Sequence, residues 1–144
     1  MYIDSSLSTQ IGKGLVVFVG VSRDDTNDDI EFVVNKTISL RIFSDDIGKF
    51  NFSCQEVAGE ILLVSQFTLF ADIRKGNRPS FFSAAPPEIA KIMFEQTVEK
   101  FAATGLVIQT GVFQQHMMID LSNDGPVSLL VDSTIRHLSR RKTG

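Results

Sequence analysis

Residues 60–70 read EILLVSQFTLF and form the strongest strand pattern in the chain. The apolar run ILLV at 61–64 is short and uninterrupted, which is typical of a strand buried on both faces. A second run, LVVFVGV at 15–21, is β-branched and follows the glycine-containing turn IGKG at 11–14. We therefore predict a strand over residues 60–70 and a fully buried strand over residues 15–21.

Two helices are predicted from the spacing of apolar side chains. Acidic and polar residues at 24–29 supply cap candidates for the first helix, and Pro86-Pro87-Glu88 opens the second, which Gly105 can cap. Both helices are amphipathic and are expected to cover the sheet. The apolar faces consist of Ile30, Val33, Val34, Thr37 and Ile38 in the first helix and of Ile89, Met93, Phe94, Thr97, Val98 and Phe101 in the second.

The remaining segments predict short strands, turns and one long loop, in the order of a single mixed α+β domain. The loop at 71–87 is longer than a compact domain usually tolerates without a functional reason. After Ser133 the chain becomes polar and basic, so a frayed tail is expected there. Further strands are expected at 41–43, 50–52, 107–110, 117–122 and 127–132, with turns at 45–49 and 123–126.

Composition limits the classes of protein to which the chain can belong. It has 144 residues, of which 43% are hydrophobic and 22% charged, the balance expected of one globular domain. No apolar run approaches the length of about 18 residues that crosses a bilayer, and the first six residues do not resemble a signal peptide. We expect a cytoplasmic protein with no membrane association. The lone Cys54 and the two scattered histidines have no metal-ligand spacing, so no metal site is predicted.

The net charge of −3 argues against nucleic-acid binding by bulk electrostatics, but the charge is unevenly distributed. Residues 1–133 hold ten basic and 17 acidic side chains, a net charge of −7, yet Arg74, Lys75 and Arg78 form a compact basic loop. Such a loop can bind a small RNA end or simply be solvated, and a solvated loop is the commoner case. Four basic residues follow Ser133 without an acid among them: Arg136, Arg140, Arg141 and Lys142.

The chain shows no familiar pairing of a nucleophile with a base. His116 and His137 have no Ser or Cys in a known arrangement, so a Ser-His-Asp triad has little support. The polar pair Ser65-Gln66 interrupts an apolar strand, and buried polar groups cost free energy unless they find partners. Either a satisfied core network or a functional site accounts for this pair equally well. Gly125-Pro126 alone predicts only a turn.

Several uninterrupted motifs in order resemble the bacterial-type D-aminoacyl-tRNA deacylases. These motifs are SQFTLFAD at 65–72, RKGNRPSF at 74–81, AAPP at 84–87 and NDGPV at 123–127, and the similarity covers about residues 2–133. Gly111, Phe113 and Met117 also match family positions that line the pocket. A chance match of several such motifs in the right order is improbable.

The resemblance implies an α+β domain with a mixed, barrel-like β-sheet covered by two main helices, assembled as a homodimer. The Gly125-Pro126 bond is expected to be cis, and each subunit is expected to place this turn into its partner's active site. The implied reaction is hydrolysis of the ester of D-aminoacyl-tRNA, and of glycine mischarged on other tRNAs, without a metal or other cofactor. The carbonyls of the Gly-Pro turn would exclude L-amino acids by collision.

The resemblance also implies a role for each candidate site residue. Backbone N–H groups around Phe67 and Thr68 would stabilise the oxyanion, and the 2′-hydroxyl of the terminal adenosine would assist proton transfer. Thr68 carries a hydroxyl in the motif, but a positioning role is favoured because no base stands beside it in sequence. The implied catalytic residues are Ser65, Gln66, Phe67 and Thr68, and the implied substrate-binding residues are Phe81, Ala84, Phe113, Met117, Gly125 and Pro126.

The chain departs from the family pattern at both ends. Residues 1–4 match the family's second strand, so the first family strand is expected to be missing, and with it an arginine that braces the Gly-Pro turn. The deacylase domain is accordingly expected over residues 1–133, followed by a basic C-terminal tail at 134–144. Two alternatives remain: a non-catalytic nucleic-acid-binding dimer of the same fold, and a related deacylase that clears mischarged L-Ala-tRNA.

Overall fold

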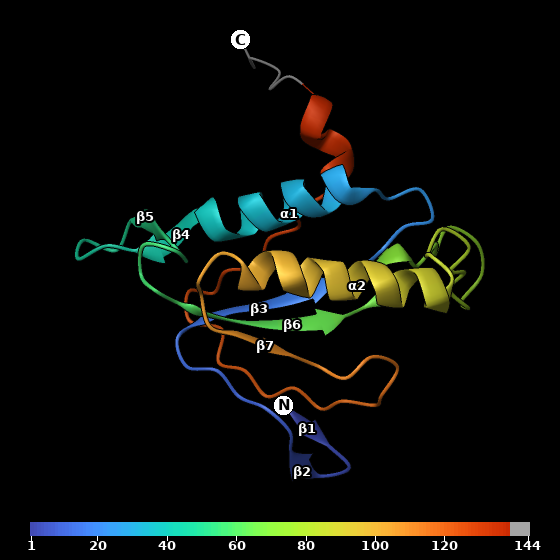
Figure 1. Cartoon of the computed structure of the whole chain (residues 1–144), viewed down its shortest axis with the longest axis horizontal. Helices are drawn as coiled ribbons and strands as arrows, with labels where there is room; N and C mark the ends of the chain where they lie inside the picture. The colour runs from blue at the N-terminus through green and yellow to red at the C-terminus, as the bar shows by residue number, and fades with distance from the viewer. Residues whose placement is uncertain (139–144) are drawn as a thin grey trace.

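Three parallel strands form the central sheet of the computed structural model, which describes residues 1–138. The strands β3 (Gly14–Val19), β6 (Glu60–Ser65) and β7 (Ile108–Thr110) lie in the order β3-β6-β7. The helices α1 (Asn27–Ser39) and α2 (Pro87–Ala102) lie together along one face of this sheet (Figure 1). Both helices lie where the sequence predicts them, and the mixed α+β class is confirmed.

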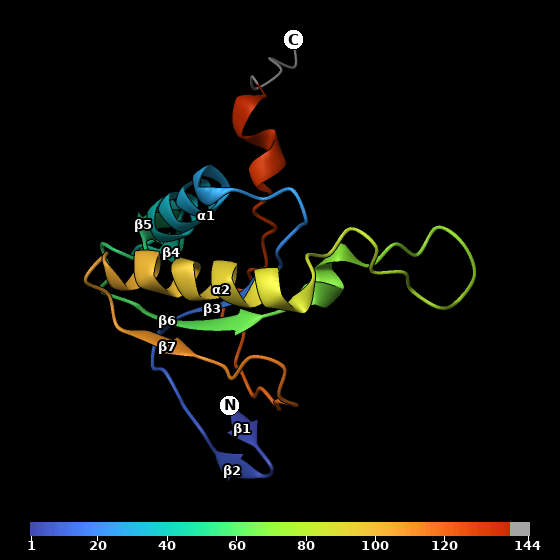
Figure 2. The ribbon, with the colours of Figure 1, turned by 45° about the vertical axis from the view of Figure 1, so that its right-hand side comes forward.

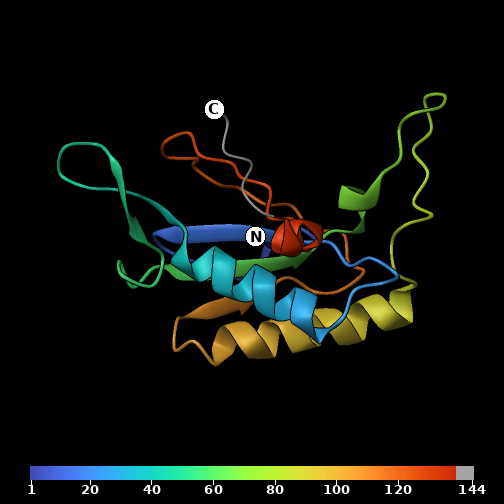
Figure 3. The ribbon, with the colours of Figure 1, turned by 90° about the horizontal axis from the view of Figure 1, so that it is seen from above.

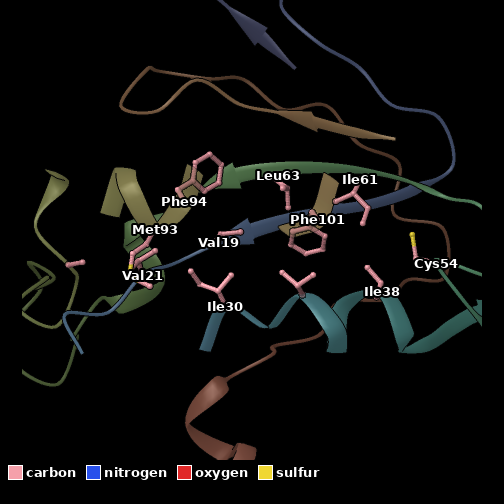
Figure 4. Packing of buried hydrophobic residues seen from close by; sticks show 12 residues of the cluster. Val19, Val21, Ile30, Ile38, Cys54, Ile61, Leu63, Met93, Phe94 and Phe101 are labelled. Carbon is pink, nitrogen blue, oxygen red and sulfur yellow. The ribbon is translucent and has the colours of Figure 1, made fainter. Parts of the chain in front are cut away.

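The core follows from the alternation of side chains along β6. Ile61 and Leu63 point to the helices, where they pack with Phe101 of α2, and all three are fully buried (Figure 4). Leu62 and Val64 point to the other face and pack with Met1. Because both faces of β6 are covered, its apolar run needs no polar alternation. Among the described residues no helix is both long and apolar enough to span a membrane.

Two small antiparallel sheets complete the described part, and no closed barrel forms within it. β1 (Tyr2–Ile3) pairs with β2 (Ser6–Leu7), and β4 (Arg41–Ser44) pairs with β5 (Phe50–Ser53) around the predicted turn. The strands predicted at 117–122 and 127–132 are wrong, apart from an isolated bridge between Tyr2 and Met118. A strand needs a neighbour to satisfy its backbone groups, and beyond this bridge neither segment forms a ladder with another segment of residues 1–138.

Strand β6 is shorter than the sequence predicts, because it ends at the residue where its partner strand β3 ends. Ser65 pairs with Val19, the last residue of β3, and the Gln66 N–H still donates to the Val19 carbonyl at 2.8 Å. Beyond that point the ladder has no partner, and the chain turns into the 3-10 helix η1 (Phe67–Phe70). The end of β3 therefore determines where the polar motif of residues 65–68 leaves the sheet.

The chain after Asp132 is not frayed, at least as far as residue 138. Residues Ser133–His137 form the 3-10 helix η2, which contacts α1. Arg136 forms an ion pair with Asp29, and Asp29 in turn accepts hydrogen bonds at 2.8 Å from the Thr26 N–H and hydroxyl at the start of α1. The prediction of a frayed tail is thus wrong for residues 133–138, because it neglected a charge partner distant in sequence. Arg140, Arg141 and Lys142 lie outside the described residues.

The Arg136–Asp29 pair is expected to stabilise the fold. Burial alone would raise the pKa of Asp29, but hydrogen bonds from Thr26 and Ser133 and the charge of Arg136 together lower it. A lowered pKa means stability that is present above about pH 3.8 and is lost as the pH falls through the folded-state value. Arg136→Gln should therefore lower the free energy of unfolding at pH 7 by about 1–3 kcal/mol, measured by urea denaturation.

The exposed pair Lys100–Glu31 provides the matched control for this measurement. Lys100→Gln should lower the free energy of unfolding much less than Arg136→Gln does, since exposed ion pairs contribute little. The difference between wild type and Arg136→Gln should also shrink as the pH falls below 3.8. Equal losses in the two variants, or a loss at Arg136 that is independent of pH, would contradict the stabilising role of this pair.

Candidate active site

The polar motif at the end of β6 is held in place by the neighbouring strand β3. Gly20, the residue after β3, lies directly beneath η1: a Cβ there would stand 2.9 Å from the Phe70 ring and 3.2 Å from the Leu69 Cβ. Any larger residue here would require the Phe70 ring and Leu69 to shift. Ser65 and Gln66 are half-buried at this junction, whereas Phe67 and Thr68 are exposed. The end of β3 therefore determines the position of η1 relative to the sheet, and the first residues of η1 are exposed to solvent.

Two adjacent backbone N–H groups are available at the start of η1. Neither the Phe67 nor the Thr68 N–H donates to an acceptor within residues 1–138, whereas the next N–H, that of Leu69, donates to the Gln66 carbonyl at 3.3 Å. The first N–H groups of a helix have no partner inside it. A pair of such donors can stabilise negative charge that develops on a reacting carbonyl oxygen.

The Thr68 hydroxyl is engaged by its neighbour and not by a base. Gln66 Nε2 donates a hydrogen bond to Thr68 Oγ1. In the described part of the chain, no His, Lys, Asp or Glu side chain hydrogen-bonds to this hydroxyl. His116 lines a separate cavity of about 450 Å³ with Tyr2 and Asp4. The arrangement favours a positioning role for Thr68.

An aromatic pair forms one wall beside η1. The rings of Phe67 and Phe81 meet edge to face with centroids 4.9 Å apart and planes at 72°. Ala84 lies next to this pair, because its N–H donates to the Phe81 carbonyl at 3.1 Å. Ala84 also forms an isolated antiparallel β-bridge with Ser22. The structure thus gathers the following predicted residues in one region: Ser65, Gln66, Phe67, Thr68, Phe81 and Ala84.

Phe113 and Met117 lie on opposite faces of the sheet within one chain. The Phe113 ring packs on the helix side, 6.5 Å from the ring of Phe94. Met117 packs on the other face with Leu62 and Val64. A single subunit therefore does not bring these two residues into one pocket, and their role as substrate contacts stays a prediction.

The Gly-Pro turn is held by Asn123, which the sequence reasoning missed. Asn123 Oδ1 accepts the Val127 N–H at 3.0 Å, and its Nδ2 donates to Ser128 Oγ at 3.3 Å. An asparagine that bonds to nearby backbone is a recognised turn signal and could have identified this role. The Gly125-Pro126 peptide bond is cis, as the resemblance implied. The orange-red segment that contains the turn lies away from η1 (Figures 1 and 3).

In the described part of the chain no three His, Cys, Asp or Glu side chains are grouped so that they could hold a metal ion. Cys54 is fully buried beneath the central sheet, and burial raises the pKa of its thiol. A buried thiol with a raised pKa is a poor nucleophile. The groups available for chemistry near η1 are therefore backbone amides, hydroxyls, one carboxamide and aromatic rings.

Comparison with known proteins gives consistent matches across nearly the whole chain. The family described as D-Tyr-tRNA(Tyr) deacylase matches residues 1–132. A relative from Desulfitobacterium hafniense named D-aminoacyl-tRNA deacylase is 53% identical over 131 residues, covering 91% of this chain and 88% of the relative. One of the same name from Clostridioides difficile is 46% identical and covers 92% and 89%.

Two solved structures share the fold. One, named c-Myc DNA Unwinding Element Binding Protein, matches with a TM-score of 0.81 and 37% identity over 88% of this chain and 86% of that one. Another, described as a probable eukaryotic D-amino acid tRNA deacylase, has a TM-score of 0.63 and 16% identity over 74% of this chain and 77% of that one, so it supports the fold alone. From the match over residues 1–132 and the identity of its relatives, the chain belongs to the D-Tyr-tRNA(Tyr) deacylase family.

Proposed function

We propose that the chain hydrolyses the ester that joins a D-amino acid, or glycine mischarged on another tRNA, to the 3′ end of tRNA. The products are the amino acid and free tRNA, and this substrate places the reaction in the cytoplasm. The observation that carries the proposal is the identity of about one half, over 91% of the chain, to a relative named D-aminoacyl-tRNA deacylase.

The chemistry near η1 is compatible with ester hydrolysis. An aminoacyl ester is already reactive, so a site that positions it and stabilises the tetrahedral oxygen accelerates its hydrolysis. The N–H groups of Phe67 and Thr68, which have no acceptor within residues 1–138, are proposed to bind that oxygen. The 2′-hydroxyl of the terminal adenosine is proposed to assist proton transfer to and from the attacking water. Ser65 and Gln66 would then hold the strand end on which both amides depend.

We also propose that the chain acts as a homodimer in which the Gly125-Pro126 turn enters the partner's site. In support, the turn lies away from η1 in its own chain (Figure 3), so a chain cannot supply both parts without a partner. Apolar side chains near the turn are exposed, including Leu129 at 59% and Leu130 at 80%. Large apolar side chains exposed in this way would be covered if this face forms an interface.

In such a dimer the substrate pocket would combine residues of two subunits. Phe81, Ala84, Phe113 and Met117 are proposed to line it, and the carbonyls of Gly125 and Pro126 to crowd the direction of an L side chain. Glycine has no side chain to collide, so glycyl-tRNA remains a substrate. Discrimination by collision acts on the hand of the amino acid and not on the identity of its side chain.

A deacylation assay tests the proposed function. Purified protein is incubated with D-Tyr-tRNA and with Gly-tRNA, and the remaining ester is compared with a buffer control. Faster decay of both esters supports the proposal. If neither ester decays faster than in buffer, the proposal fails.

A second candidate is a nucleic-acid-binding dimer without catalysis. The observation that favours it is the name of the structure that is 37% identical, c-Myc DNA Unwinding Element Binding Protein. Retention of duplex DNA by a protein that leaves both esters intact would select this candidate. Including L-Ala-tRNA in the assay tests the remaining possibility, a deacylase for mischarged L-alanine.

Thr68→Ala is expected to retain measurable deacylation, within about tenfold of wild type, because the amide and not the hydroxyl contacts the substrate. A true nucleophile would lose about 10⁴-fold or more on the same change. The measurement is the single-turnover rate constant with D-Tyr-tRNA. Thr104→Ala, which removes a hydroxyl beyond the end of α2, serves as the matched control. Near-complete loss of activity in Thr68→Ala alone would show that the hydroxyl attacks.

A further inference from the structure

Residues 72–80, which we name the arm, project from the body beside η1 (Figure 2). Two backbone hydrogen bonds join the two ends of the arm at its base. The Asp72 N–H donates to the Ser80 carbonyl at 2.7 Å, and the Ser80 N–H donates to the Asp72 carbonyl at 3.0 Å. Every residue from 73 to 80 is exposed. At the tip, Gly76 adopts a φ of +66°, and nothing lies within 4 Å of the position a Cβ would take. The arm is thus closed at its base and open to solvent along its length.

One of the three basic side chains of the arm is neutralised within it. The Arg74 guanidinium donates to both carboxylate oxygens of Asp72 at 2.9 and 2.7 Å. These hydrogen bonds and the charge of Arg74 lower the pKa of Asp72 to about 2. The Arg74–Asp72 ion pair therefore lies at the base of the arm, and the pair as a whole carries little net charge.

The other cations of this region have no counter-charge among the described residues. Lys75 and Arg78 on the arm form no ion pair within residues 1–138. Arg23 likewise forms no ion pair within residues 1–138. Its guanidinium stacks on the exposed Phe82 ring at 4.3 Å, and its backbone N–H donates to the Ser83 carbonyl at 3.3 Å. Three uncompensated cations thus border one loop in a chain whose residues 1–133 carry a net charge of −7.

The arm is continuous with the candidate active site. It begins directly after η1, where the Ala71 N–H donates to the Thr68 carbonyl at 3.1 Å, and it ends at Phe81, whose ring contacts Phe67. The four peptide links from Asp72 to the tip at Gly76 span at most about 14 Å. At a stacked rise of about 3.4 Å per nucleotide, this length corresponds to about four nucleotides. An RNA whose 3′ end lies at η1 can therefore pass along the arm.

We propose that the arm is a phosphate-binding element for tRNA, in which Lys75, Arg78 and Arg23 contact the RNA backbone within about four nucleotides of the 3′ end. The inference rests on the proposed function, since it assumes that the 3′ end occupies η1. Contacts of this kind position the substrate without reading its sequence, because phosphates are the same in every tRNA. They add binding energy for the whole RNA that a short ester cannot provide.

The test compares two substrates and two matched variants. Lys75→Gln/Arg78→Gln removes the two charges of the arm that form no ion pair within residues 1–138. The control Lys36→Gln/Lys49→Gln removes two exposed charges, one in the last turn of α1 and one between β4 and β5, which lie at the opposite end from the arm (Figure 3). Each protein is assayed with D-Tyr-tRNA and with D-tyrosyl-adenosine, which has no upstream phosphates. The readout is kcat/KM as a function of salt concentration.

For tRNA, the slope of log kcat/KM against log salt should become shallower in the arm variant by about 1.4, or 0.7 for each lost contact with a single-stranded phosphate. Its rate with D-tyrosyl-adenosine should equal that of wild type, and the control variant should match wild type with both substrates. An unchanged tRNA slope would show that the arm is only solvated, and an equal loss with both substrates would show that it shapes the site. Either result overturns the inference.

Failure of the proposed function gives a different result. In that case wild type hydrolyses neither ester, and binding of uncharged tRNA across a salt series replaces the kinetic readout. A lower slope for the arm variant would still support the phosphate contacts, and equal slopes would overturn them.

Discussion

Gly20→Val is expected to lower the rate constant for D-Tyr-tRNA deacylation by about 100-fold or more, because a displacement of about 1 Å at a catalytic group costs that much. A Cβ at this position would stand 2.9 Å from the Phe70 ring. The added side chain must displace the Phe70 ring and the Leu69 Cβ of η1, and we expect the Phe67 and Thr68 amides to move with η1. The effect should appear in single-turnover measurements, which report the chemical step.

Gly12→Val is the matched control for this variant. The atoms nearest to a Cβ at Gly12 belong to the Glu60 carboxylate and lie 3.8 Å or more away, an ordinary van der Waals distance, so the fold should accommodate it. Gly20→Ala should give an intermediate loss, and thermal unfolding would check that each variant remains folded. A folded Gly20→Val protein with wild-type activity would show that catalysis does not depend on the placement of η1.

The second large effect is expected at Gly125, where Gly125→Ala should reduce the ratio of D to L deacylation by about tenfold or more. A Cβ there would stand 2.6 Å from Val127 Cγ2 and 2.8 Å from the Val127 backbone nitrogen. The turn must then reshape, and the carbonyls that crowd an L side chain shift with it. Because a Cβ this close to backbone forces the turn to change shape, thermal unfolding and size-exclusion chromatography check that the variant remains a folded dimer. Unchanged selectivity in a variant with an altered turn would contradict the proposed exclusion of L-amino acids.

Mixing the two variants tests whether the turn acts across subunits. A dimer of one Gly20→Val subunit and one Gly125→Ala subunit has one intact site if the turn enters the partner's site, and none if it serves its own chain. Selective activity should therefore recover when equal amounts of the two proteins are unfolded together and refolded. About half of the randomly formed dimers combine both variants, and each of these has one intact site of two, so the mixture should reach about one quarter of the wild-type value. No recovery would place the turn and η1 of each site in the same chain.

The central sheet and both helices could be predicted from the sequence because their signals are local. The run ILLV on β6 and the spacing of apolar residues in α1 depend only on burial and on helical or strand periodicity. The end of β6 could not be predicted in this way. It depends on where β3 ends at Val19 and on the contact between Gly20 and Phe70, which join residues about 50 positions apart.

The site was predicted in part for the same reason. Residues 65–68 lie together because they are consecutive, and Phe81 joins them through the ring contact with Phe67. Phe113 and Met117 fall on opposite faces of the sheet, which spacing along the chain does not reveal. The docking of η2 was missed because Arg136 and Asp29 are 107 residues apart. The role of Asn123 was missed although its turn chemistry is visible in the sequence.

A paired assay tests the central claim most directly. The claim is that backbone groups near η1 promote hydrolysis of the ester while the Gly-Pro turn excludes L-amino acids. The same tRNA is charged with D-tyrosine and with L-tyrosine, and both esters are followed with one preparation of the protein. The D ester should decay well above the buffer rate while the L ester decays at that rate. Equal acceleration of both esters, or of neither, would contradict the claim.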